Sequence, residues 1–226
     1  MVKRAEPYVT ADNLAEQTRK WLAQIREVVP RQPQLVLSPA KCGLLVIDAL
    51  NYFADPEGRA YQPAAAAILP QIGRLLDVWR KNEFKVAFTR HCHEGTHDLG
   101  MLGKFFKDFI HEGEPESQIV PSLAPIAGEP VFRKTTYDGF HGTGLDAWLR
   151  QCGLSQVLVV GMLTQLCCET TARSAFVHGF EVYVAADATL TSNERLHIGA
   201  LTGLASGVAV IMTVDEVERI CRRHLS

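Results

Sequence analysis

The stretch that decides the fold is VLVVGMLTQLCCETTARSAFVHGF, residues 157–180. Its first four residues are apolar and mostly β-branched, which is typical of a parallel strand buried on both faces. Gly161 ends this strand, and the pattern from Thr164 to Gly179 is helical. We therefore expect Cys167 in the first turn of a helix, where unpaired backbone N–H groups and the helix dipole favour a thiolate. The stretch predicts a reactive cysteine near the carboxyl end of a strand, where α/β sheets bind ligands.

The rest of the chain repeats this alternation of strands and helices. We predict strands over 43–48, 85–89, 130–134, 156–161, 181–188 and 208–213. We predict helices over 10–28, 64–82, about 101–110, 143–152 and 193–205, and a last helix from 214 or 215. Parallel strands joined by right-handed crossovers carry helices on both faces of the sheet. The predicted fold is a single doubly wound, three-layer α/β/α domain with a mainly parallel sheet over 40–226, preceded by an N-terminal helix and connector over 1–39.

The composition is that of a soluble globular enzyme. Of the 226 residues, 47% are hydrophobic and 21% are charged, and the formal net charge is −2. Since no long basic run occurs, we expect neither nucleic acid nor an anionic membrane as a partner. The six cysteines have no disulfide-framework spacing, and the N-terminus lacks the apolar centre of a secretion signal. These features predict a cytoplasmic protein with free thiols.

Three side chains with catalytic potential stand at the carboxyl ends of predicted strands. Asp48 ends the first strand, Lys134 ends the third, and Cys167 follows the fourth. Because parallel strands end at one edge of the sheet, these three can meet in space. A thiolate could then attack a carbon, a carboxylate could carry the proton, and an ammonium could stabilise the charges. Each also has a structural interpretation: Asp48 as a cap, Lys134 as a solvated charge, and a cysteine as a small buried apolar residue.

Three segments with these residues resemble a known family. They are LLVIDALNYF (44–53), FRKTTYDGFHGTGLDAWL (132–149) and VLVVGMLTQLCCETTARSAFVHGFEVYVAADAT (157–189). They contain G-x-x-T-x-x-C, which ends at Cys167, and K-x-x-Y-x-x-F, which begins at Lys134. The chain resembles the isochorismatase-like cysteine hydrolases, which include nicotinamidases, N-carbamoylsarcosine amidase, ureidoacrylate and maleamate amidohydrolases, and true isochorismatases. The resemblance covers roughly residues 40–215.

The resemblance implies roles for individual residues. It implies that Asp48 is the general base and acid, Lys134 its charged partner and Cys167 the nucleophile. It also implies a cis peptide bond at Met162–Leu163. In the family, this bond turns the N–H of Leu163 inward, so that it forms an oxyanion hole with the N–H of Cys167.

Further residues are candidates for substrate or metal contacts. We expect the substrate contacts to come from the loop 90–118 and the segment 49–62, with a neighbouring subunit as a further candidate. Phe53 matches an aromatic residue that commonly packs on the substrate in the family, and Tyr137 and His91 are expected to contact the substrate too. Nicotinamidases bind a metal through an Asp-x-His pair, but here the loop reads His91-Cys92-His93, followed by His97. Three histidines could bind zinc, although loop or substrate-binding roles are favoured over this alternative. We therefore expect no cofactor and no metal.

The resulting hypothesis is a cysteine-dependent hydrolase of a C–N bond in a small amide, ureido or carbamoyl compound, with a thioester intermediate. True isochorismatases lack the thiol and cleave a vinyl ether, so the alternative is a vinyl-ether hydrolase that uses Asp48 and Lys134 without Cys167. A third hypothesis is a non-enzymatic binding or scaffold protein that has kept the fold. The family resemblance also implies a homo-oligomer that acts on a small-molecule substrate.

Overall fold

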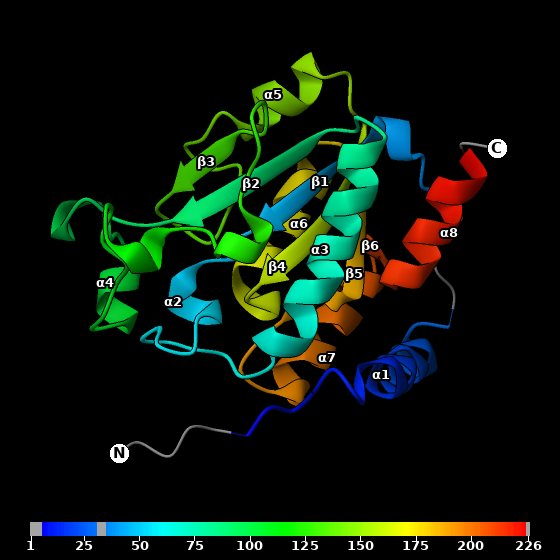
Figure 1. Ribbon diagram of the computed structural model, residues 1–226, viewed down its shortest axis with the longest axis horizontal. Coiled ribbons are helices and arrows are strands. Elements are labelled where there is room, and N and C mark those ends of the chain that lie inside the picture. The colour runs from blue at the N-terminus through cyan, green and yellow to red at the C-terminus, as the bar shows by residue number, and fades with distance from the viewer. Residues whose placement is uncertain (1–5, 31–34, 225–226) are drawn as a thin grey trace.

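A sheet of six parallel strands runs through the middle of the fold (Figure 1). In the computed structural model, which describes residues 6–30 and 35–224, the strand order is β3-β2-β1-β4-β5-β6. The strands are β1 (Cys42–Ile47), β2 (Val86–His91), β3 (Val131–Lys134), β4 (Gln156–Met162), β5 (Glu181–Leu190) and β6 (Ala209–Met212). The central β1 and β4 are buried along their whole length, as their continuous apolar runs predict.

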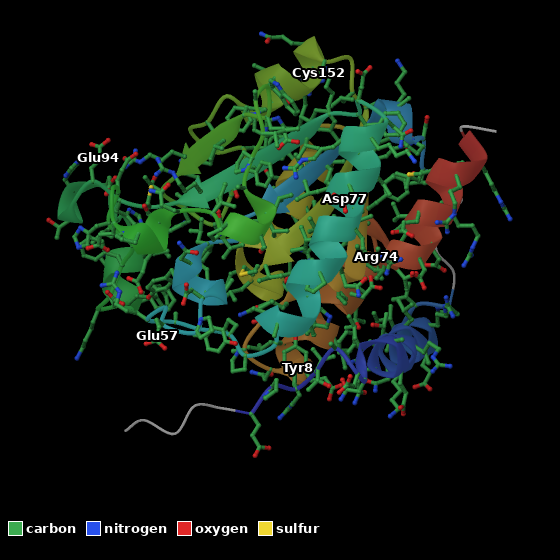
Figure 2. All side chains as sticks on the ribbon, in the orientation of Figure 1. Tyr8, Glu57, Arg74, Asp77, Glu94 and Cys152 are labelled. Atoms are coloured by element: carbon green, nitrogen blue, oxygen red, sulfur yellow. The ribbon has the colours of Figure 1, made fainter. Side chains whose placement is uncertain are left out.

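Helices cover both faces of the sheet, so the predicted three-layer α/β/α fold is confirmed. On one face lie α3 (Ala65–Lys81) and α8 (Val214–His224). The other face carries α5 (Leu145–Gln151), α6 (Glu169–Val177) and α7 (Glu194–Ala205). Arg74 of α3, labelled in Figure 2, joins the two helices of its face through ion pairs with Asp215 at 2.7 Å and Glu218 at 2.9 Å.

The strand order reverses its direction between β1 and β4, and this point positions the site. From β1 the chain proceeds outward through β2 to β3, and it then returns to β4 on the other side of β1. In doubly wound sheets, the ligand crevice lies at the carboxyl ends of the strands at such a switch point. Gly161, with φ of 117°, lets the end of β4 approach β1, because a Cβ at this position would collide with the carbonyl oxygen of Ile47.

The N-terminal helix α1 (Leu14–Val28) packs into the same core as the sheet. It begins four residues later than predicted, after Asn13, and part of the expected connector, 31–34, lies outside the described residues. Trp21 of α1 is fully buried and stands edge-on to His197 of α7, with ring centroids 4.6 Å apart. The Trp21 Nε1–H donates to Glu194 Oε1 at 2.7 Å. This helix is therefore an integral part of the hydrophobic core.

The free energy of unfolding is expected to depend on pH through Asp187 in β5. Burial raises the pKa of this carboxyl to about 6, and its Oδ1 accepts the Val214 N–H at 2.9 Å at the start of α8. A carboxyl whose pKa is raised in the folded state stabilises folding at low pH, and this contribution is lost as the pH rises through about 6. Asp187→Asn keeps the acceptor without the charge. We expect it to raise the free energy of unfolding by about 3 kcal/mol at pH 8 and to leave it nearly unchanged near pH 4.

Urea unfolding of both proteins at the two pH values measures this difference. An equal difference at pH 4 and pH 8 would contradict the proposed origin in the buried charge.

In the part of the chain that the structure describes, no helix combines the length and the hydropathy that crossing a lipid bilayer requires.

Candidate active site

The three strand-end residues meet at the carboxyl edge of the sheet. Asp48 follows β1, Lys134 is the last residue of β3, and Cys167 lies in the turn after β4. The Lys134 ammonium nitrogen lies 2.7 Å from Asp48 Oδ2 and 3.3 Å from Cys167 Sγ. Asp48 and Lys134 are buried, and Cys167 is 6% exposed. The structure thus brings together the three residues that the sequence placed at one edge.

Asp48 is held by the neighbouring strand and by its own backbone conformation. Its φ is 44°, in the left-handed region that few residues other than glycine adopt and in which Asp is enriched. Thr89 in β2 fixes the side chain, because its hydroxyl donates to Asp48 Oδ1 at 2.7 Å and accepts the Asp48 N–H at 3.2 Å. The sequence placed Thr89 in a strand but gave no sign of this role, since it does not reveal which strands are adjacent.

Lys134 and Asp48 form a buried ion pair. Burial is the largest single influence and acts against both charges, but the interactions with Asp48 and Cys167 together outweigh it and raise the pKa of Lys134. The interactions of Asp48 with Lys134, His91 and Cys167 together outweigh burial in the same way and lower the pKa of Asp48. Lys134 also donates to the Thr136 carbonyl oxygen at 2.8 Å and contacts His91 Nδ1 at 3.2 Å. The resting site therefore contains a carboxylate and an ammonium, which gives it no net charge from this pair.

Cys167 is a thiol at neutral pH, and the expected stabilisation of a thiolate by the helix start is wrong. Burial, reinforced by the Asp48 carboxylate and opposed by Lys134, raises the pKa of Cys167 to about 12. The residues Thr164–Cys168 also form a π-helical turn, and α6 begins only at Glu169. Desolvation of a buried sulfur is the larger effect here. Activation of the thiol therefore requires a base close to it, and a carboxylate oxygen of Asp48 lies within 4.8 Å of Cys167 Sγ.

The backbone before Cys167 has the geometry that the resemblance implied. The Met162–Leu163 peptide bond is cis. Leu163, Leu166 and Cys167 line the same cavity. Thr164 lies between them on the π-helical turn and is fully buried, with its hydroxyl 3.0 Å from His197 Nδ1. The turn that carries the cysteine is thus fixed from behind by α7.

A row of polar side chains, His91, His93 and Asp98, leads from Lys134 toward the protein surface. His91 Nε2 lies 3.0 Å from His93 Nε2, and His93 Nδ1 lies 3.1 Å from the Asp98 carboxylate. A carboxylate can only accept, so we assign a proton to His93 Nδ1, and His93 Nε2 then accepts from His91 Nε2–H. His91 Nδ1, which carries no proton in this assignment, lies 3.2 Å from the Lys134 ammonium and 3.1 Å from the Thr136 carbonyl oxygen. This assignment makes both rings neutral. Burial, together with the Lys134 charge, lowers the pKa of His91 to about 4, and burial lowers that of His93.

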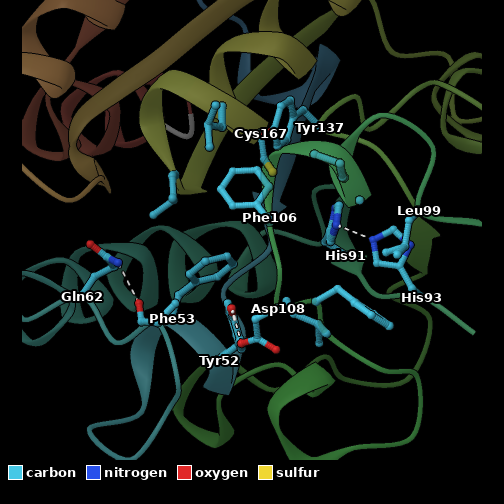
Figure 3. Close-up of a pocket in the computed structure, with 17 residues that line it drawn as sticks. Tyr52, Phe53, Gln62, His91, His93, Leu99, Phe106, Asp108, Tyr137 and Cys167 are labelled. Atoms are coloured by element: carbon cyan, nitrogen blue, oxygen red, sulfur yellow. Dashed lines mark hydrogen bonds between the residues drawn. The ribbon is translucent and has the colours of Figure 1, made fainter. Parts of the chain in front are cut away.

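A cavity of about 220 Å³ opens in front of Cys167 (Figure 3). The three residues predicted to contact the substrate, Phe53, His91 and Tyr137, all line it. Most of the other lining residues come from the segments 49–62 and 90–118, which were expected to contact the substrate, although none of these residues was predicted individually: Tyr52, Ala60, Gln62, Leu99, Leu102, Gly103, Phe106, Asp108, Phe109 and Ile110. Leu166 lines the cavity without having been predicted in any form. Figure 3 shows Cys167 on one side of the cavity and the Tyr52–Asp108 pair on the other.

Several of these lining residues lie in the segment 101–110, for which the predicted secondary structure is wrong. The expected helix over 101–110 is only α4 (Leu102–Phe105), and Phe106 has an extended backbone. The segment after it pairs with the loop after β2 instead, because the His93 N–H donates to the Ile110 carbonyl oxygen and the Glu112 N–H donates to that of His93, both at 2.8 Å. This pairing places Phe106, Asp108 and Phe109 on the cavity wall.

The histidines do not form the set of three zinc ligands that the sequence left open. His91 and His93 face each other, but His97 is exposed. Among the residues that the structure describes, the one group of three or more metal-binding side chains with donor atoms within 4.8 Å of one another is Asp48, His91 and Cys167. The Lys134 ammonium contacts all three of these side chains, so a cation already occupies their centre. These donors do not fit a metal ion.

Comparison with known proteins places this chain in a family. The model of the isochorismatase domain matches residues 42–216, and the chain belongs to the isochorismatase family. Nicotinamidase 3 of Arabidopsis thaliana is 38% identical over 179 residues, which are 78% of this chain and 86% of that protein.

Two further similarities cover most of the chain. A ureidoacrylate amidohydrolase of Methylobacterium radiotolerans is 28% identical, and the match covers 78% of each protein. The crystal structure of a cysteine hydrolase from Pseudomonas syringae pv. phaseolicola superposes with a TM-score of 0.82 at 25% identity and covers 86% of this chain and 98% of that one. The predicted family is thus confirmed.

Proposed function

We propose that this protein is a thiol-dependent amidase that hydrolyses the C–N bond of a small amide through a thioester on Cys167. At the level of enzyme class, it is a hydrolase that acts on carbon–nitrogen bonds other than peptide bonds, in agreement with its amidohydrolase relatives. The observation that carries the finer proposal is the position of the Lys134 ammonium, 2.7 Å from Asp48 Oδ2 and 3.3 Å from Cys167 Sγ. This contact holds an acid–base group and a nucleophile together at the cavity.

The first step is transfer of the thiol proton to Asp48. The pKa of Cys167 is about 12, so few molecules carry a free thiolate at neutral pH, and Asp48 must take the proton as the substrate binds. Lys134 remains positive and stabilises the thiolate as it forms. The Sγ then attacks the amide carbonyl carbon. In our proposal, the N–H groups of Leu163 and Cys167 donate to the oxyanion that develops on the carbonyl oxygen.

The second half of the reaction reverses the proton path. Protonated Asp48 gives its proton to the departing nitrogen, the C–N bond breaks, and ammonia or an amine leaves. The acyl group then remains on Sγ as a thioester. Asp48, again a carboxylate, takes a proton from a water molecule as the water oxygen attacks the thioester carbon. The C–S bond then breaks, the carboxylic acid leaves, and Asp48 returns its proton to Sγ, which regenerates the thiol.

A screen of small amides for ammonia release tests this proposal. The names of the relatives, nicotinamidase and ureidoacrylate amidohydrolase, suggest carboxamides and ureido compounds as the first sets to try. Mass spectrometry after an acid quench should detect the chain with an acyl group attached to Cys167. The vinyl-ether alternative, which uses Asp48 and Lys134 alone, gives no role to a thiol that Lys134 contacts at 3.3 Å and that lies within 4.8 Å of the Asp48 carboxylate.

We also propose that the reaction needs no metal ion. Among the residues that the structure describes, Asp48, His91 and Cys167 are the one group of three potential metal ligands, and the Lys134 ammonium already lies among them. Dialysis against EDTA and then 1,10-phenanthroline is expected to leave kcat and KM within about twofold of their starting values, because a metal enzyme of this kind would lose its activity with its metal. Elemental analysis of the purified protein accompanies the assay. Recovery of lost activity by added zinc, and not by buffer alone, would contradict this prediction.

A further inference from the structure

We propose that the cavity selects amides with an uncharged acyl group and disfavours those that bear a carboxylate, and that Asp108 is the residue that sets this preference. The inference rests on the proposed amidase function. It concerns only the part of the substrate that lies in front of Cys167, and not the chemistry at the thiol.

The walls of the cavity are mainly aromatic and aliphatic. Among the lining residues of the described chain, only Asp108 carries a formal charge at neutral pH, because His91 and His93 are neutral. Walls of this kind remove water from a bound group and offer a carboxylate no positive partner. The aromatic rings of Phe53, Phe106 and Tyr137 would instead pack on an apolar or planar acyl group.

Asp108 places negative charge at the side of the cavity opposite Cys167 (Figure 3). Its carboxylate accepts from the Tyr52 hydroxyl at 3.1 Å and is about half exposed. A substrate carboxylate in the cavity would be repelled by Asp108, and at a partly exposed site such repulsion amounts to about tenfold to a hundredfold in binding. The repulsion is screened by salt, so the preference should weaken as ionic strength rises.

The arginine beside Asp108 does not offset this charge. Arg59 pairs with Asp108 and Glu114, each at 3.1 Å, and with Glu116 at 2.6 Å. One guanidinium against three carboxylates leaves this group with a net charge of −2. The same Arg59 nitrogen that binds Glu114 also donates to the Phe109 carbonyl oxygen at 3.3 Å. Arg59 is thus already engaged by protein acceptors and is not part of the cavity lining.

The other nearby cations are also unavailable to a substrate in the cavity. Lys134 lies behind Cys167 and is fully occupied by Asp48, Cys167 and the Thr136 carbonyl oxygen. Lys104 and Lys107 are on the segment that forms the wall, but both are exposed and neither lines the cavity. An anionic acyl group in the cavity is therefore repelled by Asp108 and meets no positively charged side chain among the described lining residues.

The test compares two amides of nearly equal shape. Succinamate carries a carboxylate, and 4-oxopentanamide carries a methyl ketone in its place. We expect the wild-type protein to show a kcat/KM at least about tenfold higher for 4-oxopentanamide. In Asp108→Asn, which keeps an acceptor for Tyr52 and leaves Glu114 and Glu116 on Arg59, we expect kcat/KM for succinamate to rise several-fold and that for the neutral amide to change little.

Asp77→Asn is the matched control, because Asp77 is an exposed carboxylate on α3 that does not line the cavity (Figure 2). It should leave the ratio of the two kcat/KM values unchanged. The inference is overturned if the wild-type protein has equal kcat/KM values for succinamate and 4-oxopentanamide. It is also overturned if Asp108→Asn, like Asp77→Asn, does not change the ratio of these two values.

Binding separates this inference from the proposed function. Calorimetry with the Cys167→Ala variant measures the affinity for both compounds without turnover, and the same preference is expected there. If neither compound is a substrate, their inhibition constants against an amide that is hydrolysed replace kcat/KM. Absence of hydrolysis of any amide would contradict the proposed function alone, whereas equal affinities for the two compounds would contradict the charge preference alone.

Discussion

Replacement of Cys167 by alanine is expected to lower kcat for any amide substrate by about 10⁴-fold or more, because removal of a covalent nucleophile leaves only binding and oxyanion stabilisation. The substrate should still bind, since the variant keeps the cavity walls. The measurement is ammonia release under saturating amide, with circular dichroism and thermal unfolding to show that the variant is folded. The same protein should give no acylated chain in the mass spectrum after a quench.

The neighbouring cysteine provides a matched control. Cys168 is fully buried and does not line the cavity, so Cys168→Ala should retain activity while losing some stability through the small void it creates. Full activity in Cys167→Ala would falsify the thioester mechanism. If that variant cleaved a vinyl ether at the wild-type rate while Asp48→Asn did not, the alternative function would be the correct one.

Replacement of Lys134 by methionine is expected to remove activity and to lower the free energy of unfolding by about 3–5 kcal/mol. Methionine fills a similar volume but leaves the Asp48 carboxylate buried without its positive partner. Native domains are stable by about 5–15 kcal/mol, so this loss is a large share of the total. Urea unfolding and the ammonia assay measure the two effects on the same preparation.

The double variant Asp48→Asn/Lys134→Met separates stability from catalysis. It removes both charges, so it should recover much of the stability that Lys134→Met loses, but it should stay inactive because the proton carrier is gone. If the double variant were no more stable than the single one, the two charges would not be coupled as their 2.7 Å contact indicates.

The sequence was sufficient to predict the sheet and the meeting of Asp48, Lys134 and Cys167. Buried parallel strands have continuous β-branched runs that stand out from the amphipathic pattern of helices, and their carboxyl ends lie at one edge whatever the strand order is. Thr89 shows the limit of this reasoning. Its bonds to Asp48 depend on β2 lying beside β1, and no local pattern encodes that adjacency.

Two other expectations failed because tertiary contacts outweighed local ones. A cysteine at the start of a helix is expected to have a lowered pKa, but desolvation at the buried position of Cys167 raises its pKa. The apolar residues of 101–110 have a spacing that a helix could use, yet after Phe105 the backbone pairs with the loop after β2 and the side chains line the cavity. Asp108 lies in this segment, which was expected to contact the substrate, but its individual position at the cavity depends on this backbone pairing.

The packing of α1 has a consequence for anyone who expresses this protein in pieces. The match to the family model begins at residue 42, and a fragment designed from that boundary would omit the helix. It would uncover His197, whose ring packs on Trp21 and whose Nδ1 contacts Thr164 on the turn that carries the cysteine. We therefore expect a fragment that begins at residue 42 to be less stable than the full chain and to hold the turn at Cys167 less firmly.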